Sequence, residues 1–306
     1  PSNAQECKDY LKLAYEISEK YDTVVLLRSN TRVSHSRGIV ELGERTEKDR
    51  IPYEKNIQKY VAMPAMARKH IAQEQRMDRI AKDTADITLG MKADAAAGEA
   101  DSLPLNIIEL NDTKIGIITS GICYQYVKEA LPEVSVLKMG MINPIPKAMI
   151  EAFAAKVDQL YVIEEGDPFF EEQIRAMGID ARGKSIFPIC GELLPEDIAE
   201  CCRKAGILKD APSARANEAI PDLPIRSPLL CSGCPHRSTF YHLSQMKLPV
   251  AGDIGCYNLG TLPPFNAQHT MGSMGASVGV LHGMGLSGLP EPAVCTIGDG
   301  TFFHAG

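Results

Sequence analysis

The sequence has 306 residues, of which 44% are hydrophobic and 23% charged, and these globular proportions exclude a wholly disordered chain. Lysine and arginine total 32 against 39 aspartates and glutamates, and this net charge of −7 argues against a nucleic-acid partner. At about 150 residues per domain, the length predicts two or three domains.

The stretch from Ile254 to Pro290 is the longest without Asp, Glu, Lys or Arg. Prolines, asparagines and many glycines interrupt it, so it cannot supply the roughly 20 apolar residues of a membrane span. Nine cysteines without a signal peptide favour a reducing, cytoplasmic setting over a disulfide scaffold. Because the sequence starts at Pro1 without Met and stops at Gly306 inside a motif, we expect a piece of a longer polypeptide.

Residues 1–90 are expected to be the tail of an α/β domain. Ser2 and Gln5 have the spacing of a capping box, and a helical apolar pattern follows. Thr23 to Leu27 is typical of a buried strand, and Gly38 to Leu42 is a second short apolar run. A charged helix should then run from about Pro64 to Lys82, before a linker at 91–104 rich in Ala, Asp and Gly.

Residues 105–207 alternate regularly between apolar runs and helical patterns, which predicts one α/β domain with parallel strands and right-handed crossovers. Residues 208–228, which contain four prolines, are expected to be a linker. The predicted strands are Ile115–Thr119, Ser135–Met139, Leu160–Ile163 and Ser185–Ile189, and the predicted helices are Cys123–Leu131, Pro146–Val157, Phe169–Met177 and Pro195–Ala205.

Residues 229–306 carry the chemistry. A small-residue helix is predicted from about Met271 to Leu286, and the apolar run Ala293 to Ile297 enters Gly298-Asp299-Gly300. An aspartate between glycines at the carboxyl end of a parallel strand can hold Mg²⁺ against a diphosphate. Asp-Gly is also common turn chemistry, so an ordinary turn is the alternative.

Cys231 and Cys234 have metal-ligand spacing, and Cys256 ends the next predicted strand. Thiolates favour zinc or an iron–sulfur cluster, and both usually need four ligands. The alternatives are a redox pair, a zinc site completed by His236, or small buried hydrophobic residues. The remaining cysteines are expected to be core or surface residues: Cys7, Cys123, Cys190, Cys201, Cys202 and Cys295.

Two polar groups outside this region are weaker candidates. Arg28, Arg32 and His35 follow a predicted strand and could line a cleft, although structural roles are more common for such residues. The acids of Glu164-Glu165 and Asp167 end another predicted strand, where we favour capping of the next helix. Met271, Met274 and Met284 are expected to be helix core.

The last region contains the motifs Cys231-Ser-Gly-Cys234-Pro-His236-Arg237, Gly252-Asp253-Ile254-Gly255-Cys256-Tyr257, Met274-Gly-Ala-Ser277 and Ile297-Gly-Asp-Gly-Thr-Phe-Phe-His304. These motifs resemble the thiamine-diphosphate domain of the alpha subunit of indolepyruvate:ferredoxin oxidoreductases, in the thiamine-dependent 2-oxoacid:ferredoxin oxidoreductase family. Earlier stretches resemble the pyrimidine and transketolase-C-like domains of that family in the same order: Pro1-Ser2 with Gln5-Glu6, Leu27-Arg28 with Thr31-Arg32-Val33-Ser34-His35, Ile117-Ile118-Thr119-Ser120-Gly121, and Glu164-Glu165 with Asp167-Pro168.

This resemblance implies an α/β fold with parallel-sheet domains of the thiamine-diphosphate-enzyme type. It implies oxidative decarboxylation of aryl 2-oxo acids with coenzyme A and ferredoxin, by an oligomer with a second (beta) subunit. The implied cofactors are thiamine diphosphate, Mg²⁺ and a 4Fe-4S cluster. Gly255, Cys256, Gly298, Asp299 and Gly300 would contact the cofactor, with Asp299 as the Mg²⁺ ligand, and the candidate cluster ligands are Cys231, Cys234 and Cys256.

The sequence departs from the family pattern in two ways. It stops before the Asn-containing segment that completes Mg²⁺ coordination, and it lacks the cluster segment and most of the pyrimidine domain. We therefore expect this piece to be inactive alone, with the fourth cluster thiolate supplied from beyond Gly306. The alternative functions are a non-oxidative arylpyruvate decarboxylase and a catalytically silent scaffold subunit.

Overall fold

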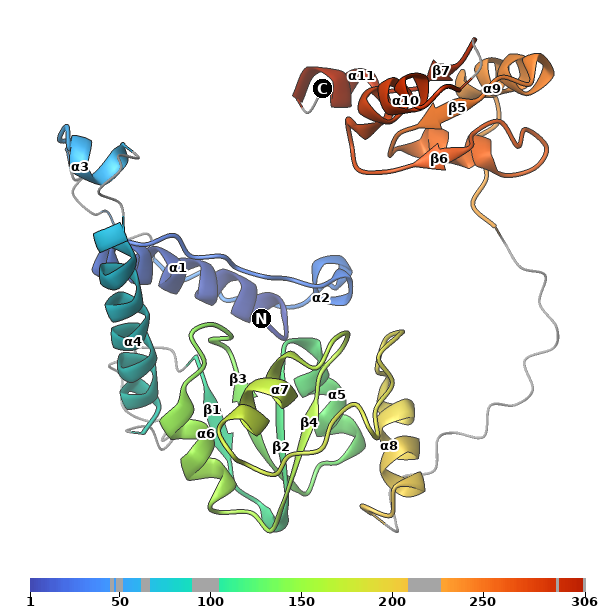
Figure 1. Ribbon diagram of the computed structural model, residues 1–306. Coiled ribbons are helices and arrows are strands. Elements are labelled where there is room, and N and C mark those ends of the chain that lie inside the picture. The colour runs from blue at the N-terminus through green and yellow to red at the C-terminus, as the bar shows by residue number, and fades with distance from the viewer. Residues whose placement is uncertain are drawn as a thin grey trace. The chain divides into compact units, whose positions relative to one another are not determined.

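The computed structural model describes residues 1–44, 47, 52–61, 67–89, 105–208, 227–289 and 292–304. The chain divides into two compact units, Pro1–Glu218 (unit 1) and Ala219–Gly306 (unit 2), each described here by itself (Figure 1). The predicted linker 91–104 and most of the predicted linker 208–228 lie outside the described residues. The division into three domains stays a prediction.

The centre of unit 1 is a four-stranded sheet in the order β1-β3-β2-β4. The central strand β2 is parallel to β3 and β4, as predicted, whereas β1 runs antiparallel to β3. Since β1 is only three residues long, it has no periodic pattern by which the sequence could reveal it. The strands are β1 (Ile107–Glu109), β2 (Asp112–Ser120), β3 (Val134–Met139) and β4 (Gln159–Ile163).

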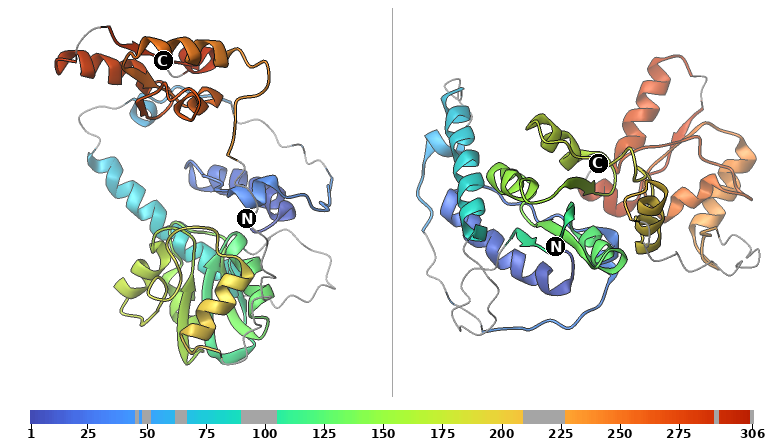
Figure 2. Two further views of the ribbon diagram at one scale, coloured as in Figure 1. Left: turned by 90° about the vertical axis from the view of Figure 1, so that its right-hand side faces the viewer. Right: turned by 90° about the horizontal axis from the view of Figure 1, so that it is seen from below.

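Helices cover both faces of this sheet. Adjacent residues of β2 point to opposite sides: Ile117 joins the apolar cluster beneath α5 and α8, and Ile118 joins the cluster beneath α6 and α7. Figure 2 shows α6 and α8 on opposite sides of the sheet. The predicted parallel α/β architecture is therefore confirmed. The helices are α5 (Ile122–Ala130), α6 (Lys147–Ala154), α7 (Phe169–Ala176) and α8 (Pro195–Lys204).

The predicted strand Ser185–Ile189 is wrong. The segment is a turn, in which the N–H groups of Ile186 and Phe187 both donate to the carbonyl of Gly183. Phe187 is buried in the core beneath α5 and α8. The apolar run thus supplies a side chain to the core, while its backbone N–H groups form hydrogen bonds within the turn. An apolar run alone is therefore not enough to predict a strand.

The described residues before 90 form the helices α1 (Ala4–Tyr21), α2 (Thr31–His35), α3 (Ile57–Tyr60) and α4 (Ala67–Leu89). The cap of α1 lies one residue later than predicted. The side chain of Asn3, not that of Ser2, accepts the N–H of Glu6, while the Glu6 carboxylate accepts the N–H of Ser2. Helix α1 lies across the carboxyl ends of the strands (Figure 1), and α4 packs against α6.

The strand predicted at Thr23–Leu27, near the start of the chain, is also wrong. Thr23–Leu27 and Gly38–Leu42 have no regular structure, and Val24, Leu26 and Ile39 are 83%, 89% and 97% exposed. A strand needs a neighbour to accept its backbone hydrogen bonds, and no strand in the described part of unit 1 lies beside either segment.

Unit 2 is built on a parallel three-stranded sheet in the order β6-β5-β7. Helix α10 packs on all three strands, and Phe240 of α9 lies in a small core with Leu230 and Ala267. The elements are α9 (His236–Met246), β5 (Val250–Gly252), the 3-10 helix η2 (Cys256–Thr261), β6 (Thr270–Met271), α10 (Ala276–Leu286), β7 (Val294–Cys295) and α11 (Asp299–His304).

The small-residue helix begins at Ala276 instead of the predicted Met271. Residues 273–275 form a bend and turn after β6, and Gly275 in the left-handed region at φ 87° directly precedes the helix. Met271 and Met274 are 60% and 44% exposed, so the expected core role is wrong for both. No helix in the described ranges is long and apolar enough to cross a membrane.

Candidate functional site

Two turns meet at the carboxyl edge of the sheet in unit 2. Because β5 and β7 are parallel neighbours, the segments that leave them emerge on the same edge. Strand β5 leads into Asp253-Ile254-Gly255 and then η2, which starts at Cys256. Strand β7 leads into Gly298 and then α11, which starts at Asp299. The structure therefore brings together two motifs that lie about 40 residues apart in the sequence.

Tyr257 joins the two turns. Its hydroxyl accepts the N–H of Gly298 at 3.1 Å and donates to the carbonyl of Ile254 at 3.0 Å. A Cβ on Gly255 would lie 2.4 Å from Cε1 of the tyrosine ring, and a Cβ on Gly298 would lie 3.2 Å from it. Both predicted cofactor-binding glycines therefore leave room for this ring. The role of Tyr257 could not be predicted from the sequence, because its partner Gly298 lies 41 positions away.

Asp253 fixes the first turn to the start of α10. Its carboxylate is completely buried and accepts the N–H groups of Ile254 at 2.7 Å and Gly275 at 2.9 and 3.0 Å. The hydroxyl of Ser277 donates to it at 3.0 Å. Burial works to raise the pKa of Asp253, but these hydrogen bonds outweigh it and hold the pKa below its ordinary value. Asp253 is thus a structural carboxylate.

Asp299 has the opposite character. It is exposed at the first residue of α11, and its Oδ1 accepts the N–H of Gly300 at 2.8 Å. A Cβ on Gly300 would meet no atom within 4 Å, so the backbone there is open to a ligand. An exposed carboxylate beside open backbone suits a hard cation such as Mg²⁺, which prefers oxygen ligands. The residues present fit one side of a Mg²⁺–diphosphate site.

The cysteines are less well arranged. All nine are free thiols, with Cys231 and Cys256 exposed and Cys234 half-buried against the core around Phe240. Among the residues that the structure describes, no three His, Cys, Asp or Glu side chains form a group that could hold a metal ion. Cys231, Cys234 and Cys256 are therefore not gathered into such a group in the described structure, and their role as cluster ligands stays a prediction. His236 instead packs edge-on against the Tyr257 ring, with centroids 5.8 Å apart.

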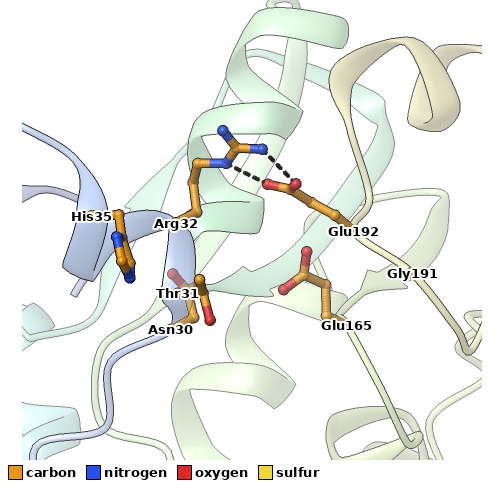
Figure 3. A pocket seen from close by; sticks show the side chains of 7 residues that line it. All are labelled: Asn30, Thr31, Arg32, His35, Glu165, Gly191 and Glu192. Atoms are coloured by element: carbon orange, nitrogen blue, oxygen red, sulfur yellow. Dashed lines mark hydrogen bonds and ion pairs between the residues drawn. The ribbon is translucent and has the colours of Figure 1, made fainter. Parts of the chain in front are cut away.

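Unit 1 contains a polar cavity of about 490 Å³ (Figure 3). It lies where α2 faces the segment after β4 and the loop before α8. Its lining residues are Asn30, Thr31, Arg32, His35, Glu165, Gly191 and Glu192. Arg32 and His35 therefore line a cleft, as considered from the sequence, whereas Arg28 does not line this cavity.

Glu192 holds Arg32 in this cavity. Arg32 donates from Nε and Nη2 to the two carboxylate oxygens at 2.7 and 2.6 Å (Figure 3). The hydroxyl of Tyr126 also donates to Oε1. The bond from Arg32, followed by that from Tyr126, lowers the pKa of Glu192 to about 2. The favoured structural role of Arg32 is supported. No local pattern points to Glu192, which lies 160 positions from Arg32 in the sequence.

Of the three acids after β4, Glu164 has the predicted capping role. Both oxygens of Glu164 accept the N–H of Phe170, and Oε1 also accepts that of Glu171, so Glu164 caps α7. Glu165 accepts the N–H of Leu193 at 3.2 Å and also lines the cavity.

Comparisons with known proteins give consistent names. No protein-family model matches the chain. Proteins named indolepyruvate oxidoreductase subunit IorA from Pyrococcus horikoshii, Archaeoglobus fulgidus and Methanothermobacter thermautotrophicus are 35%, 36% and 34% identical to it over 100% of this chain. The chain spans about half the length of these curated relatives, 51%, 50% and 50% respectively.

One solved structure is also similar, that of a 2-oxoglutarate:ferredoxin oxidoreductase from Magnetococcus marinus with 2-oxoglutarate, coenzyme A and succinyl-CoA bound. It is 25% identical and matches 32% of this chain and 19% of its own. The TM-score of 0.29 is too low to establish a shared overall fold.

Proposed function

Because the chain belongs along its whole length to the family of indolepyruvate oxidoreductase subunit IorA, we propose that it is part of a thiamine-dependent 2-oxoacid oxidoreductase. The proposed reaction is the oxidative decarboxylation of aryl 2-oxo acids, indolepyruvate first among them, with coenzyme A and ferredoxin. The products are an aryl-acetyl-CoA, CO₂ and reduced ferredoxin. The observation that carries the proposal is the meeting of the Gly255–Cys256 turn and the Gly298–Asp299 turn at one edge of a parallel sheet.

The cofactor assignment follows from this edge. Asp299 would hold Mg²⁺ through its exposed carboxylate, and Gly300 would let the diphosphate approach the backbone. Asp253 keeps the start of α10 and the first turn in one arrangement. When bound, thiamine diphosphate supplies the electron sink that decarboxylation of a 2-oxo acid requires.

The assignment of cysteines to an iron–sulfur cluster, which would carry the electrons, is a separate proposal. We infer that Cys231, Cys234 and Cys256 serve a 4Fe-4S cluster in the intact subunit, the full natural polypeptide that carries this sequence. Two of the three thiols are exposed and all are free, which leaves them accessible to iron. Iron analysis and electron paramagnetic resonance on anaerobic intact protein, with and without Cys256→Ala, test this. Loss of one cluster per subunit in the variant is expected, and an unchanged cluster count would refute the assignment.

The proposal also includes partners and a setting. The relatives are named as subunits, which supports a second (beta) subunit in a larger oligomer. Nine free thiols are compatible with the reducing cytoplasm that the sequence favours.

An anaerobic assay of the intact subunit with its partner subunit tests the function. Indolepyruvate, phenylpyruvate and pyruvate are compared with coenzyme A present and ferredoxin as acceptor. We expect ferredoxin reduction to be fastest with indolepyruvate. Aldehyde formation without ferredoxin reduction would favour the non-oxidative decarboxylase. Failure of the intact protein to bind thiamine diphosphate would favour the scaffold.

A further inference from the structure

We propose that Tyr257 is a positioning residue that sets the Gly298–Asp299 turn for Mg²⁺–diphosphate binding and links this turn to the Cys231–His236 loop. The inference rests on the proposed function, since it assigns Tyr257 a role in that site. It is carried by three contacts of one side chain.

The first contact is the hydrogen bond between the Tyr257 hydroxyl and the Gly298–Asp299 turn. The Tyr257 hydroxyl accepts the N–H of Gly298, the residue directly before Asp299. The same hydroxyl donates to the carbonyl of Ile254, so its proton is already engaged and its lone pair faces Gly298. The two bonds fix the Ile297–Gly298 peptide, which leads into Asp299, relative to the end of β5.

The second contact is steric. The ring occupies the space in which side chains at positions 255 and 298 would begin, 2.4 and 3.2 Å from Cε1. Contacts below 3 Å are not tolerated, so a side chain at position 255 and this ring exclude each other. The ring therefore spaces the two turns as well as joining them.

The third contact reaches the cysteine loop. The ring of His236, two residues after Cys234, packs edge-on against the Tyr257 ring at an interplanar angle of 73°. The Tyr257 ring and Cys234 also pack against the same small core around Phe240. A displacement of the loop would thus be transmitted to Tyr257 and from there to Gly298.

The test is the Mg²⁺ requirement for thiamine diphosphate binding, measured by titration calorimetry on the intact subunit at a series of Mg²⁺ concentrations. Tyr257→Phe removes only the hydroxyl. We expect its half-saturating Mg²⁺ concentration to rise roughly fivefold, the factor typical of one lost hydrogen bond. Tyr241→Phe, at a 55% exposed tyrosine of α9, is the matched control and should leave the Mg²⁺ requirement unchanged.

Two further variants separate positioning from general destabilisation. Leu243→Ala removes a partly buried side chain from the same core and should lower the melting temperature without raising the Mg²⁺ requirement. His236→Ala should raise that requirement in the wild-type background, but by less when Tyr257 is already Phe, since the effect passes through Tyr257.

The outcomes are distinct. Wild-type affinity and Mg²⁺ requirement in Tyr257→Phe would overturn the inference and leave the proposed function intact. An equal rise of the Mg²⁺ requirement in Leu243→Ala would also overturn the inference. It would show that any loss of stability in unit 2 raises this requirement. If the wild-type intact protein fails to bind thiamine diphosphate, the proposed function itself fails.

Discussion

Asp299 and Asp253 are both aspartates beside glycine at the same sheet edge, yet the structure gives them opposite properties. Asp253 is buried and saturated with donors, whereas Asp299 is exposed. If Asp299 is the Mg²⁺ ligand, Asp299→Ala in the intact subunit should weaken thiamine diphosphate binding at least tenfold, about 1.4 kcal/mol. Calorimetry checks this, with the exposed Asp167→Ala of unit 1 as control. Equal affinity in the Asp299 variant would contradict the assignment.

The lowered pKa of Glu192 predicts how the stability of unit 1 changes at acidic pH. Its pKa is lowered to about 2 from an ordinary 4.5, mainly by the bond from Arg32. A carboxylate with a lowered pKa stabilises the fold above its ordinary pKa, and this contribution disappears as the pH falls from about 4.5 to about 2. Glu192→Gln should therefore unfold at a lower temperature at pH 7 and depend less on pH across that window. Thermal melts measure both, and the effect should be small because the pair is partly exposed.

These residues also show how far side-chain roles could be read from the sequence. The capping by Glu164 was predicted because an acid just before a helix satisfies local N–H groups. The roles of Glu192 and Tyr257 were not predicted, because their partners Arg32 and Gly298 lie 160 and 41 positions away. Contacts between residues close together in the sequence could be predicted, whereas contacts between residues far apart in the sequence could not.

At the scale of single elements, the cap of α7 offers a test. Glu164 is buried, which raises its pKa, while the bonds from Phe170 and Glu171 act in the opposite direction. A carboxylate with a raised pKa stabilises the fold below its ordinary pKa, and this contribution is lost as the pH rises through the folded value. Glu164→Ala should cost about 1 kcal/mol of unfolding free energy, as for other caps. Glu164→Gln should keep an acceptor and lose the pH dependence. Denaturant titrations at pH 4 and pH 7 distinguish the two variants.

The elements themselves were predicted where the pattern was long and regular. From β2 to α8, each strand of five or more residues and each helix lies close to its predicted range. The errors fall on short apolar runs. Thr23–Leu27 has the composition of a strand but no neighbouring strand in the described part of the chain, and Ser185–Ile189 buries Phe187 from a turn. Composition cannot reveal whether a partner strand is present.

At the scale of the whole molecule, the two units have unequal cores. Unit 1 buries apolar clusters on both faces of its sheet, whereas the described residues of unit 2 form one small cluster of Leu230, Phe240 and Ala267. Phe240→Ala should destabilise unit 2 by roughly 3 kcal/mol, because the surroundings of a deleted aromatic ring relax only partly. Hydrogen exchange should then speed up at the amides of β5 and stay unchanged at those of β2. Faster exchange in β2 as well would show that the two units unfold together.

The chemical reactivity of Lys138 in β3 reports whether α1 is packed against the sheet. Its side chain is only 4% exposed, its amine pairs with the carboxylate of Glu6 in α1, and it lies 4.4 Å from the centroid of the Tyr124 ring. An amine enclosed in this way is shielded from acylating reagents, whereas that of Lys20, 60% exposed, is open to them. In a footprinting experiment read by mass spectrometry, the labelled fraction of Lys138 would therefore measure the fraction of molecules in which α1 is detached from the sheet.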